Sequence, residues 1–350
     1  MKLRFFTATP LNVYQGSGTF MGTWTLAKAL EDLGATVEIV SPVRRLPTFT
    51  ARRLWFNEEI RRKGDSCDLT VGVDMDGYRL AGRGRVPHVA AIKGVIADEL
   101  RFERGTVRWS LTLQSLCEAA HVRRADLVIT TSQYAASAIR RLYKLADEPA
   151  CVPEPIDLTR WETLLSRNAA EPDPRCFTLL CVCRFYPRKR VSLLLRAAAL
   201  LRHRIPELRV RIVGGGPEEA NLKRLHAELN LGERVAWLGS IPTDDLAREY
   251  SRCDAFCLPS LQEGFGIAFL EAMAAGKPVI AAKAAAIPEV IPHGFLAEPD
   301  SAESLADAIA ECRANAGVRD RFVRGAREWV RQFDAPRVAL RFLREIETLL

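Results

Sequence analysis

The stretch 258–281, LPSLQEGFGIAFLEAMAAGKPVIA, decides the fold because it reads as a strand, a glycine loop, a helix and a second strand in succession. The first strand ends at Pro259, and a helix is predicted over 267–275. Glycines in the loop let backbone amides approach a ligand closely, and a helix N-terminus attracts a phosphate or a sugar oxygen. Glu263 precedes the helix and Glu271 lies more than one turn inside it, so the two carboxylates suit different parts of one elongated ligand.

The rest of the chain repeats this alternation of apolar runs and amphipathic stretches, which is typical of parallel strands joined by crossover helices. A chain of 350 residues is long enough for two such α/β domains. The polar, proline-bearing stretch SRNAAEPDPR at 166–175 suits a linker, so we expect doubly wound domains over 1–170 and 171–333. Strands are predicted at LRFFTAT (3–9), TVEIVSP (36–42), LTVGV (69–73), HVAAI (88–92), LVITTS (127–132), FTLLCVCRF (177–185), RVRIVGGG (209–216), VAWLG (235–239), AFCLPS (255–260) and PVIAAK (278–283).

A basic loop after the strand at 177–185 is the second candidate site. It lies at the C-terminal end of a parallel strand, where doubly wound sheets bind ligands, and it holds four cations: Arg184, Arg188, Lys189 and Arg190. Arginine offers phosphate oxygens a planar fork and lysine a compact charge, so the loop suits a diphosphate. A solvated basic loop is the alternative, but the place of this loop beside 263–266 in the same sheet favours a ligand site. The glycines from Gly214 in RIVGGGP are a weaker signal, because glycines also turn a strand into a helix.

Several classes of protein are disfavoured. The 50 basic and 43 acidic residues give a mild net charge of +7, which favours anionic ligands without requiring nucleic acid. Nine cysteines lack the paired spacing of a zinc site and read as reduced thiols. The N-terminal glycines do not match the G-x-G-x-x-G of a dinucleotide site, because Met21 occupies the third position. Asp74-Met75-Asp76 is a D-x-D string, but it follows a strand of a different architecture from the one in which such strings bind a metal, so we expect no metal site.

Taken together, these residues resemble the family 4 glycosyltransferases, which are retaining enzymes of the two-Rossmann B-type fold. The resemblance covers nearly the whole chain and is strongest from 177 to 299. Its most specific part is the pair Glu263 and Glu271, with PS at 259–260 and EAMAAGKP at 271–278. It implies two Rossmann-like domains facing a cleft (GT-B), an acceptor-side domain over 1–170, a nucleotide-sugar-binding domain over 171–333, and a C-terminal helix, 334–350, that packs back on the first domain.

The same resemblance implies a role for each site residue. Glu263 and the amides that follow it would hold the donor sugar and phosphate, Glu271 the ribose hydroxyls, and the backbone near Ile241 the base. The catalytic candidates are Glu263, Arg184, Lys189 and Lys93. The donor-binding candidates are Gly16, Gly18, Gly214, Ile241, Gly264, Phe265, Gly266, Ile267 and Glu271.

The chain departs from the family pattern at three points. Lys93-Gly94 stands where the family has a histidine and a glycine, so a lysine replaces the residue expected to contact the donor sugar. A lysine can still hydrogen-bond a sugar hydroxyl or a phosphate. EPID at 154–157 replaces Asn-Gly before an apolar residue and Asp, and alanines at 285–286 replace two glycines.

The resemblance implies a metal-independent, retaining transfer from a nucleotide-diphosphate sugar to a glycan, lipid or small-molecule acceptor. The nucleotide sugar is then a co-substrate, and no further cofactor is expected. Two other classes stay open: a sugar-nucleotide epimerase or glycoside phosphorylase of the same fold, and a non-catalytic nucleotide-binding protein. Release of nucleoside diphosphate only when an acceptor is added would favour transfer.

The chain lacks a run approaching the ~20 apolar residues of a membrane span, so we expect a cytoplasmic protein. The basic and aromatic stretch 44–63 has two interpretations. It could lie on the inner face of an anionic membrane. We favour a connecting helix with Leu54, Trp55 and Phe56 packed inward.

Overall fold

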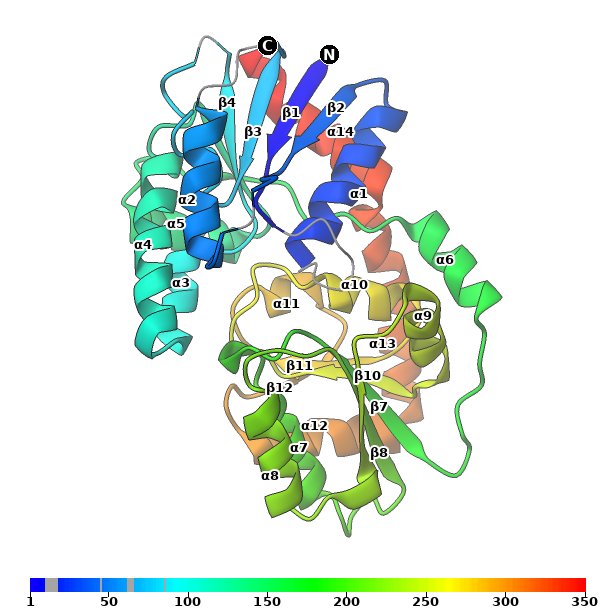
Figure 1. Cartoon of the computed structure of the whole chain (residues 1–350). Coiled ribbons are helices and arrows are strands. Elements are labelled where there is room, and N and C mark those ends of the chain that lie inside the picture. Colours follow the sequence, from blue (N-terminus) through cyan, green and yellow to red (C-terminus); the bar gives the residue numbers. More distant parts are fainter. Residues whose placement is uncertain (10–17, 45, 62–65, 85) are drawn as a thin grey trace. The chain divides into compact units, whose positions relative to one another are not determined.

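The computed structural model of the chain describes residues 1–9, 18–44, 46–61, 66–84 and 86–350. Within these residues the strands form two six-stranded sheets, and all the strand pairs are parallel (Figure 1). The chain divides into unit 1, Met1–Pro155 with Ala335–Leu350, and unit 2, Ile156–Asp334. The prediction of two doubly wound, Rossmann-like domains is confirmed.

Unit 1 contains a sheet of order β2-β1-β3-β4-β5-β6. Its strands are β1 (Lys2–Phe6), β2 (Thr36–Val40), β3 (Leu69–Val73), β4 (His88–Ile92), β5 (Leu127–Thr130) and β6 (Ala150–Cys151). Its helices are α1 (Gly18–Asp32), α2 (Phe49–Ile60), α3 (Ile96–Glu99), η1 (Leu100–Phe102), α4 (Gly105–Val122), α5 (Gln133–Tyr143), α14 (Ala335–Ile346) and η5 (Glu347–Leu349).

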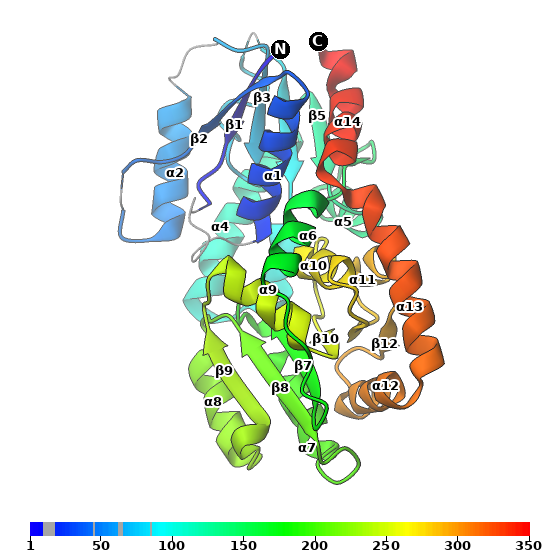
Figure 2. The ribbon, with the colours of Figure 1, turned by 90° about the vertical axis from the view of Figure 1, so that its right-hand side faces the viewer.

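Alternate residues of the unit 1 strands point to opposite faces of the sheet, and each face has its own core. Leu3 and Phe5 pack with α1 and α14 on one face, where the rings of Phe5 and Phe342 lie 6.1 Å apart. Figure 2 shows α14 beside α1. Phe6 packs against α2 on the other face. The C-terminal helix α14 thus completes the core of the unit that contains the N-terminus.

Unit 2 contains a sheet of order β12-β11-β10-β7-β8-β9. Its strands are β7 (Phe177–Val182), β8 (Leu208–Val213), β9 (Val235–Gly239), β10 (Ala255–Leu258), β11 (Val279–Ala282) and β12 (Phe295–Ala297). Its helices are α6 (Leu158–Arg167), η2 (Pro187–Lys189), α7 (Val191–Leu200), α8 (Glu219–Glu228), η3 (Gly232–Arg234), α9 (Thr243–Arg252), α10 (Ile267–Ala274), α11 (Ile287–Val290), α12 (Ala302–Ala314), α13 (Ala316–Trp329) and η4 (Val330–Phe333).

Helix α6 belongs to unit 2, although the sequence placed the domain boundary after it, at residue 170. The chain passes from unit 1 to unit 2 between Pro155 and Ile156. Helix α6 joins unit 2 because its Trp161 is buried and packs edge-on against Tyr250 of α9, with ring centroids 5.5 Å apart. The polar stretch predicted as a linker therefore lies inside unit 2 and leads from α6 to β7.

Within the described ranges, no helix combines the length and the apolar character needed to cross a bilayer. The nine cysteines are all free thiols, and four of them are buried: Cys181, Cys253, Cys257 and Cys312.

Candidate active site

The loop between β10 and α10 has the geometry that the opening stretch of sequence predicted. Gly266 precedes α10 with φ = +100°, a left-handed conformation that side chains disfavour. A Cβ at this position would lie 2.5 Å from the ring of Phe269. Phe265 is buried, and its ring packs edge-on against Phe333 at 5.2 Å. Glycine at 266 thus allows the chain to enter α10 directly from the loop, with the first amides of the helix facing the loop.

Two loops that the sequence identified separately are joined in the structure. Nζ of Lys189 lies 2.5 Å from Oε1 of Glu263, and the hydroxyl of Ser260 donates to the same oxygen at 2.9 Å. The side chains of Lys189 and Glu263 are only 14% and 8% exposed. The amide of Leu261 also donates to the carbonyl of Arg188 at 2.8 Å. A cation and a carboxylate therefore share one nearly buried position at the carboxyl ends of β7 and β10.

The other cations of the basic loop have different surroundings. Arg184 is exposed. The guanidinium of Arg188 lies over the ring of Tyr186, 4.8 Å from its centroid, and Arg190 pairs with Asp300 at 3.0 Å. The side-chain contact with the glycine loop is thus made by Lys189, and the contact of Arg184 with a diphosphate stays a prediction.

Glu271 lies in α10, away from Glu263 along the helix, as the spacing predicted. The hydroxyl of Tyr250 donates to its Oε2 at 2.9 Å. Burial raises the pKa of Glu271 to about 7, and the hydrogen bond from Tyr250 opposes that shift. The indole of Trp161 donates to the backbone carbonyl of Glu271 at 3.0 Å. Glu271 is therefore a carboxyl group poised to change its charge near neutral pH.

Three residues that support this site were missed by the sequence analysis. Tyr250 and Trp161 reach Glu271 from other helices, and no local motif marks them. Gln262 is only 1% exposed, and neither atom of its side-chain amide is hydrogen-bonded within the described part of the chain. A buried amide without a partner costs about 1–3 kcal/mol, which a bound ligand could offset. In the sequence, the position of Gln262 next to Glu263 was the feature that could have marked it as a site residue.

Gly214 and Ile241, which the sequence also assigned to the donor site, pack against other parts of unit 2. Gly214 has φ = +123°, and a Cβ there would lie 1.9 Å from the carbonyl oxygen of Cys183. Glycine is thus required where the end of β8 approaches the end of β7. Ile241 is partly buried against the core of unit 2. A cavity of about 330 Å³ lies instead near Phe177 and Asp254, at the amino ends of the strands, which is not the edge where parallel sheets bind ligands.

In unit 1, Lys93 is engaged by Glu154. Its Nζ lies 3.0 Å from Glu154 Oε2, and the two side chains are 9% and 5% exposed. Lys93 and Glu154, which both depart from the family pattern, therefore form one buried ion pair. A Cβ at Gly22 of α1 would lie 1.8 Å from the same Glu154 oxygen, so glycine makes room for the pair. Gly18 is the first residue of α1 and is exposed, and Gly16 lies outside the described residues.

We expect Glu154→Gln to lower the free energy of unfolding by about 1–3 kcal/mol. Glutamine keeps an oxygen for the Lys93 ammonium but removes the countercharge of a nearly buried cation. Urea unfolding of the two proteins measures the difference. Glu148→Gln is the matched control because Glu148 is exposed. Equal stability of Glu154→Gln and wild type would show that the ion pair contributes nothing.

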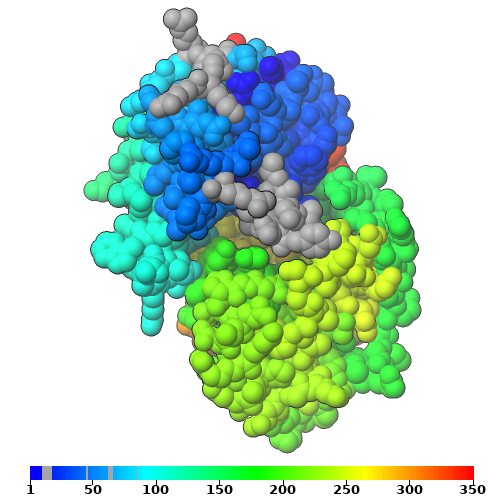
Figure 3. All heavy atoms as spheres, in the orientation of Figure 1, coloured from blue at the N-terminus to red at the C-terminus, as the bar shows by residue number. Residues whose placement is uncertain are grey.

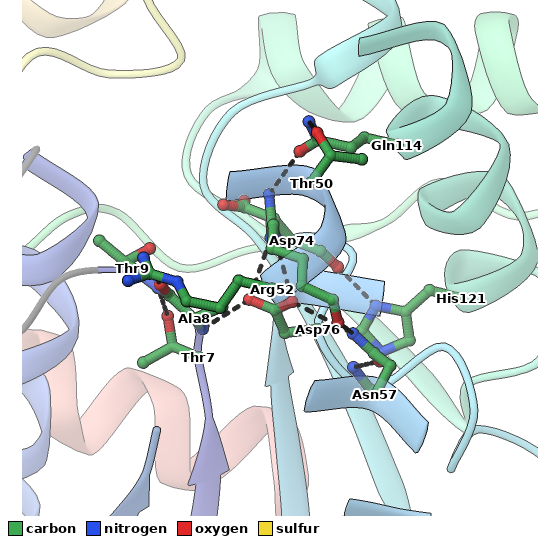
Figure 4. Close-up of polar contacts among 12 residues, drawn as sticks. Thr7, Ala8, Thr9, Thr50, Arg52, Asn57, Asp74, Asp76, Gln114 and His121 are labelled. Carbon is green, nitrogen blue, oxygen red and sulfur yellow. Dashed lines mark hydrogen bonds and ion pairs between the residues drawn. The ribbon is translucent and has the colours of Figure 1, made fainter. Parts of the chain in front are cut away.

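The two carboxylates of the D-x-D string accept hydrogen bonds from other groups of the protein. Asp76 is fully buried, and its carboxylate accepts from the amide of Ala8 at 2.7 Å and from Nε and Nη2 of Arg53 at 3.0 and 3.1 Å. Figure 4 shows Asp76 between Ala8 and Asn57. Asp74, with φ = +54°, accepts from the amide of Lys93 at 2.9 Å, and burial raises its pKa to about 6. Nowhere in the described part of the chain are three or more His, Cys, Asp or Glu side chains grouped to hold a metal ion.

Residues 165–329 match the family model described as glycosyl transferases group 1. A relative from Mycobacterium tuberculosis, a GDP-mannose-dependent alpha-(1-6)-phosphatidylinositol monomannoside mannosyltransferase, is 32% identical over 225 residues, which cover 59% of this chain and 57% of the relative. A D-inositol 3-phosphate glycosyltransferase from Saccharomonospora viridis is 32% identical over 228 residues, or 61% of this chain and 53% of that protein. The chain thus spans little more than half the length of these relatives.

Solved structures with the same fold cover nearly the whole chain. A sucrose-phosphate synthase from Thermosynechococcus elongatus has a TM-score of 0.82 at 22% identity, covering 99% of this chain and 98% of its own. Anabaena HepE in complex with UDP and glucose has a TM-score of 0.76 at 20% identity, covering 99% and 100%. These likenesses show that the whole chain has the GT-B fold, and that its residues 165–329, which lie in unit 2, are similar to the group 1 glycosyl transferases.

Proposed function

We propose that this chain transfers a sugar from a nucleotide-diphosphate sugar to an acceptor, with retention of the anomeric configuration and without a metal ion or further cofactor. The contact between Lys189 and Glu263 carries the proposal, because it sets a cation and a carboxylate beside the start of α10, at the carboxyl ends of a parallel sheet. The match of residues 165–329 to the group 1 model and the complexes of Anabaena HepE with UDP, glucose and UDP-glucose support it.

Each residue of this site has a chemical role in the proposed transfer. Lys189 offsets the negative charge that develops on the departing diphosphate. Glu263 orients Lys189 and accepts a hydrogen bond from a hydroxyl of the donor sugar, and the amides of 264–267 contact its phosphate. Glu271 accepts from the ribose hydroxyls. The acceptor attacks the face that the diphosphate leaves, and the departing phosphate takes the proton, so the step needs no separate protein base.

The names of the relatives suggest which substrates to test first. We place GDP-mannose first among the donors and UDP-glucose second, and inositol phosphates and phosphatidylinositol-type lipids first among the acceptors. A thermal-shift panel of nucleotide sugars identifies the donor, because a ligand at ~100 times its Kd adds about 2.7 kcal/mol of stability.

Release of nucleoside diphosphate is then measured with and without acceptor. Release only with acceptor, together with an α-linked product from an α-linked donor, supports retaining transfer. An epimerised nucleotide sugar, or phosphorolysis of a glycoside, would replace the proposal by one of the two alternative enzymes of this fold. Binding of the nucleotide sugar without turnover under any acceptor would indicate a binding protein.

The pKa of Glu271 predicts how donor binding depends on pH. Below about pH 7 the carboxyl is protonated and loses the charge that accepts the ribose hydroxyls, so the KM for the donor should rise several-fold from about pH 8 to about pH 6. Raising the pH, which favours donor binding, has the opposite effect on the free energy of unfolding. The folded state holds this proton more tightly than the unfolded state, so the contribution of Glu271 to stability falls as pH rises between 4.5 and about 7.

Two variants test this assignment by the pH profile of the KM. In Glu271→Gln the profile should be flat, at the high KM of the protonated enzyme. In Tyr250→Phe the rise should move to higher pH, because a hydrogen bond that lowers the pKa of Glu271 is removed. An unchanged profile in Glu271→Gln would assign the titration to another group.

A further inference from the structure

The solvent-facing side of α4 is apolar. Trp109, Leu113 and Leu116 are spaced four and three residues apart, which places them in one row along the helix, and they are 78%, 44% and 64% exposed. The opposite side is buried through Gln114, Ser115, Glu118, Ala119, His121 and Val122. A surface helix ordinarily turns its polar side to water, so a row of three large apolar side chains marks a surface for interaction.

The charges around this row are mainly positive. The segment 101–124 contains five arginines and two acids, and all five arginines are exposed: Arg101, Arg104, Arg108, Arg123 and Arg124. Of the acids, Glu118 is fully buried and receives hydrogen bonds from the amide of Ile96 and the hydroxyl of Tyr143. Glu103 is partly buried. Arg101 forms an ion pair with Asp98 at 2.8 Å. The exposed face of α4 therefore offers apolar side chains flanked by Arg104 and Arg108 at one end of the helix and by Arg123 and Arg124 at the other.

Polar bonds hold this helix firmly on unit 1. The side chain of Gln114 accepts from Nη1 of Arg53 at 3.1 Å and donates to Thr50 at 2.8 Å, and the hydroxyls of Thr50 and Ser110 lie 2.5 Å apart. These bonds join α4 to α2, where Trp55 is 48% exposed beneath the guanidinium of Arg44. Trp55 thus does not pack inward as the sequence suggested, whereas Phe56 does.

We propose that the row of Trp109, Leu113 and Leu116 docks on the surface of an anionic phospholipid bilayer. Figure 3 shows the first turns of α4 at the surface, in cyan at the left. An indole prefers the level of the headgroups, leucines enter the boundary of the acyl chains, and arginines bind lipid phosphates. A second copy docked symmetrically on this face would bring the same arginines together, and that repulsion disfavours a dimer.

Co-sedimentation of the full chain with vesicles tests the proposal. We expect the protein to pellet with phosphatidylcholine vesicles that contain phosphatidylserine, and to bind at least tenfold more weakly to phosphatidylcholine alone or in high salt. The triple variant Trp109→Ser, Leu113→Ser, Leu116→Ser should lose at least tenfold in affinity for the anionic vesicles. Arg104→Gln with Arg108→Gln should lose the preference for phosphatidylserine.

The controls use other exposed apolar residues. Leu340→Ser is the control for the Leu113→Ser change within the triple variant, because Leu340 and Leu113 are both 44% exposed and both lie on helices of unit 1. It should bind like wild type, and all variants should keep the wild-type melting temperature. Trp55→Ser tests the stretch 44–63 separately. Wild type that stays in the supernatant, a triple variant that pellets like wild type, or a wild-type dimer that the triple variant dissociates would each overturn the proposal.

Discussion

Replacing Lys189 with methionine is expected to lower kcat/KM by about 10²–10³-fold, or roughly 3–4 kcal/mol of transition-state stabilisation. The ammonium lies 2.5 Å from Glu263 in a position that is only 14% exposed, where water screens charge poorly. Methionine fills similar space but cannot offset the charge on a departing diphosphate. Because this role belongs to the transition state, most of the loss should appear in kcat rather than in KM.

The neighbouring residue supplies the control for Lys189. Arg190→Met removes one positive charge from the same loop, but Arg190 pairs with Asp300 instead of the glycine loop. Its kcat should stay within about twofold of wild type. Lys189→Arg should recover part of the activity because it restores the charge. A Lys189→Met enzyme with full kcat and an unchanged melting temperature would remove Lys189 from the reaction.

Replacing Asp76 with asparagine is expected to lower the free energy of unfolding by about 3–5 kcal/mol. The carboxylate is fully buried and binds both Nε and Nη2 of Arg53, whose side chain is 6% exposed. Asparagine has nearly the same shape but leaves the guanidinium buried without its countercharge. It also presents an NH₂ group where Arg53, Asn57 and the amide of Ala8 require an acceptor.

Urea unfolding of three variants measures this effect. Asp68→Asn is the control, because the Asp68 carboxylate accepts from the amide of Lys2 at an exposed position and its replacement should cost less than about 0.5 kcal/mol. The double variant Arg53→Met, Asp76→Leu should be more stable than Asp76→Asn, since it removes both members of the buried pair together. Equal stability of Asp76→Asn and wild type would contradict the role given to the ion pair.

The sequence predicted the long, strongly patterned elements and missed the short ones. Each predicted strand is present. An apolar run of four or more residues between glycines and prolines can be recognised in the sequence without knowing which strand it pairs with. The edge strands β6 and β12 have two and three residues, too few for any periodicity. Trp161 shows why the linker was misplaced: a polar stretch marks a surface segment, but which core the preceding helix joins depends on a contact with Tyr250 that lies far away in the sequence.

The sequence by itself determined the pair of doubly wound sheets and the glycine loop with Glu263 and Glu271, because strand period, helix start and residue spacing are local properties of the chain. Only the tertiary structure decided that Lys189 among four cations contacts Glu263, that Lys93 pairs with Glu154, and that Tyr250 adjusts the charge of Glu271. Pairings and pKa values depend on distance and burial, and these arise when segments remote in sequence are packed side by side.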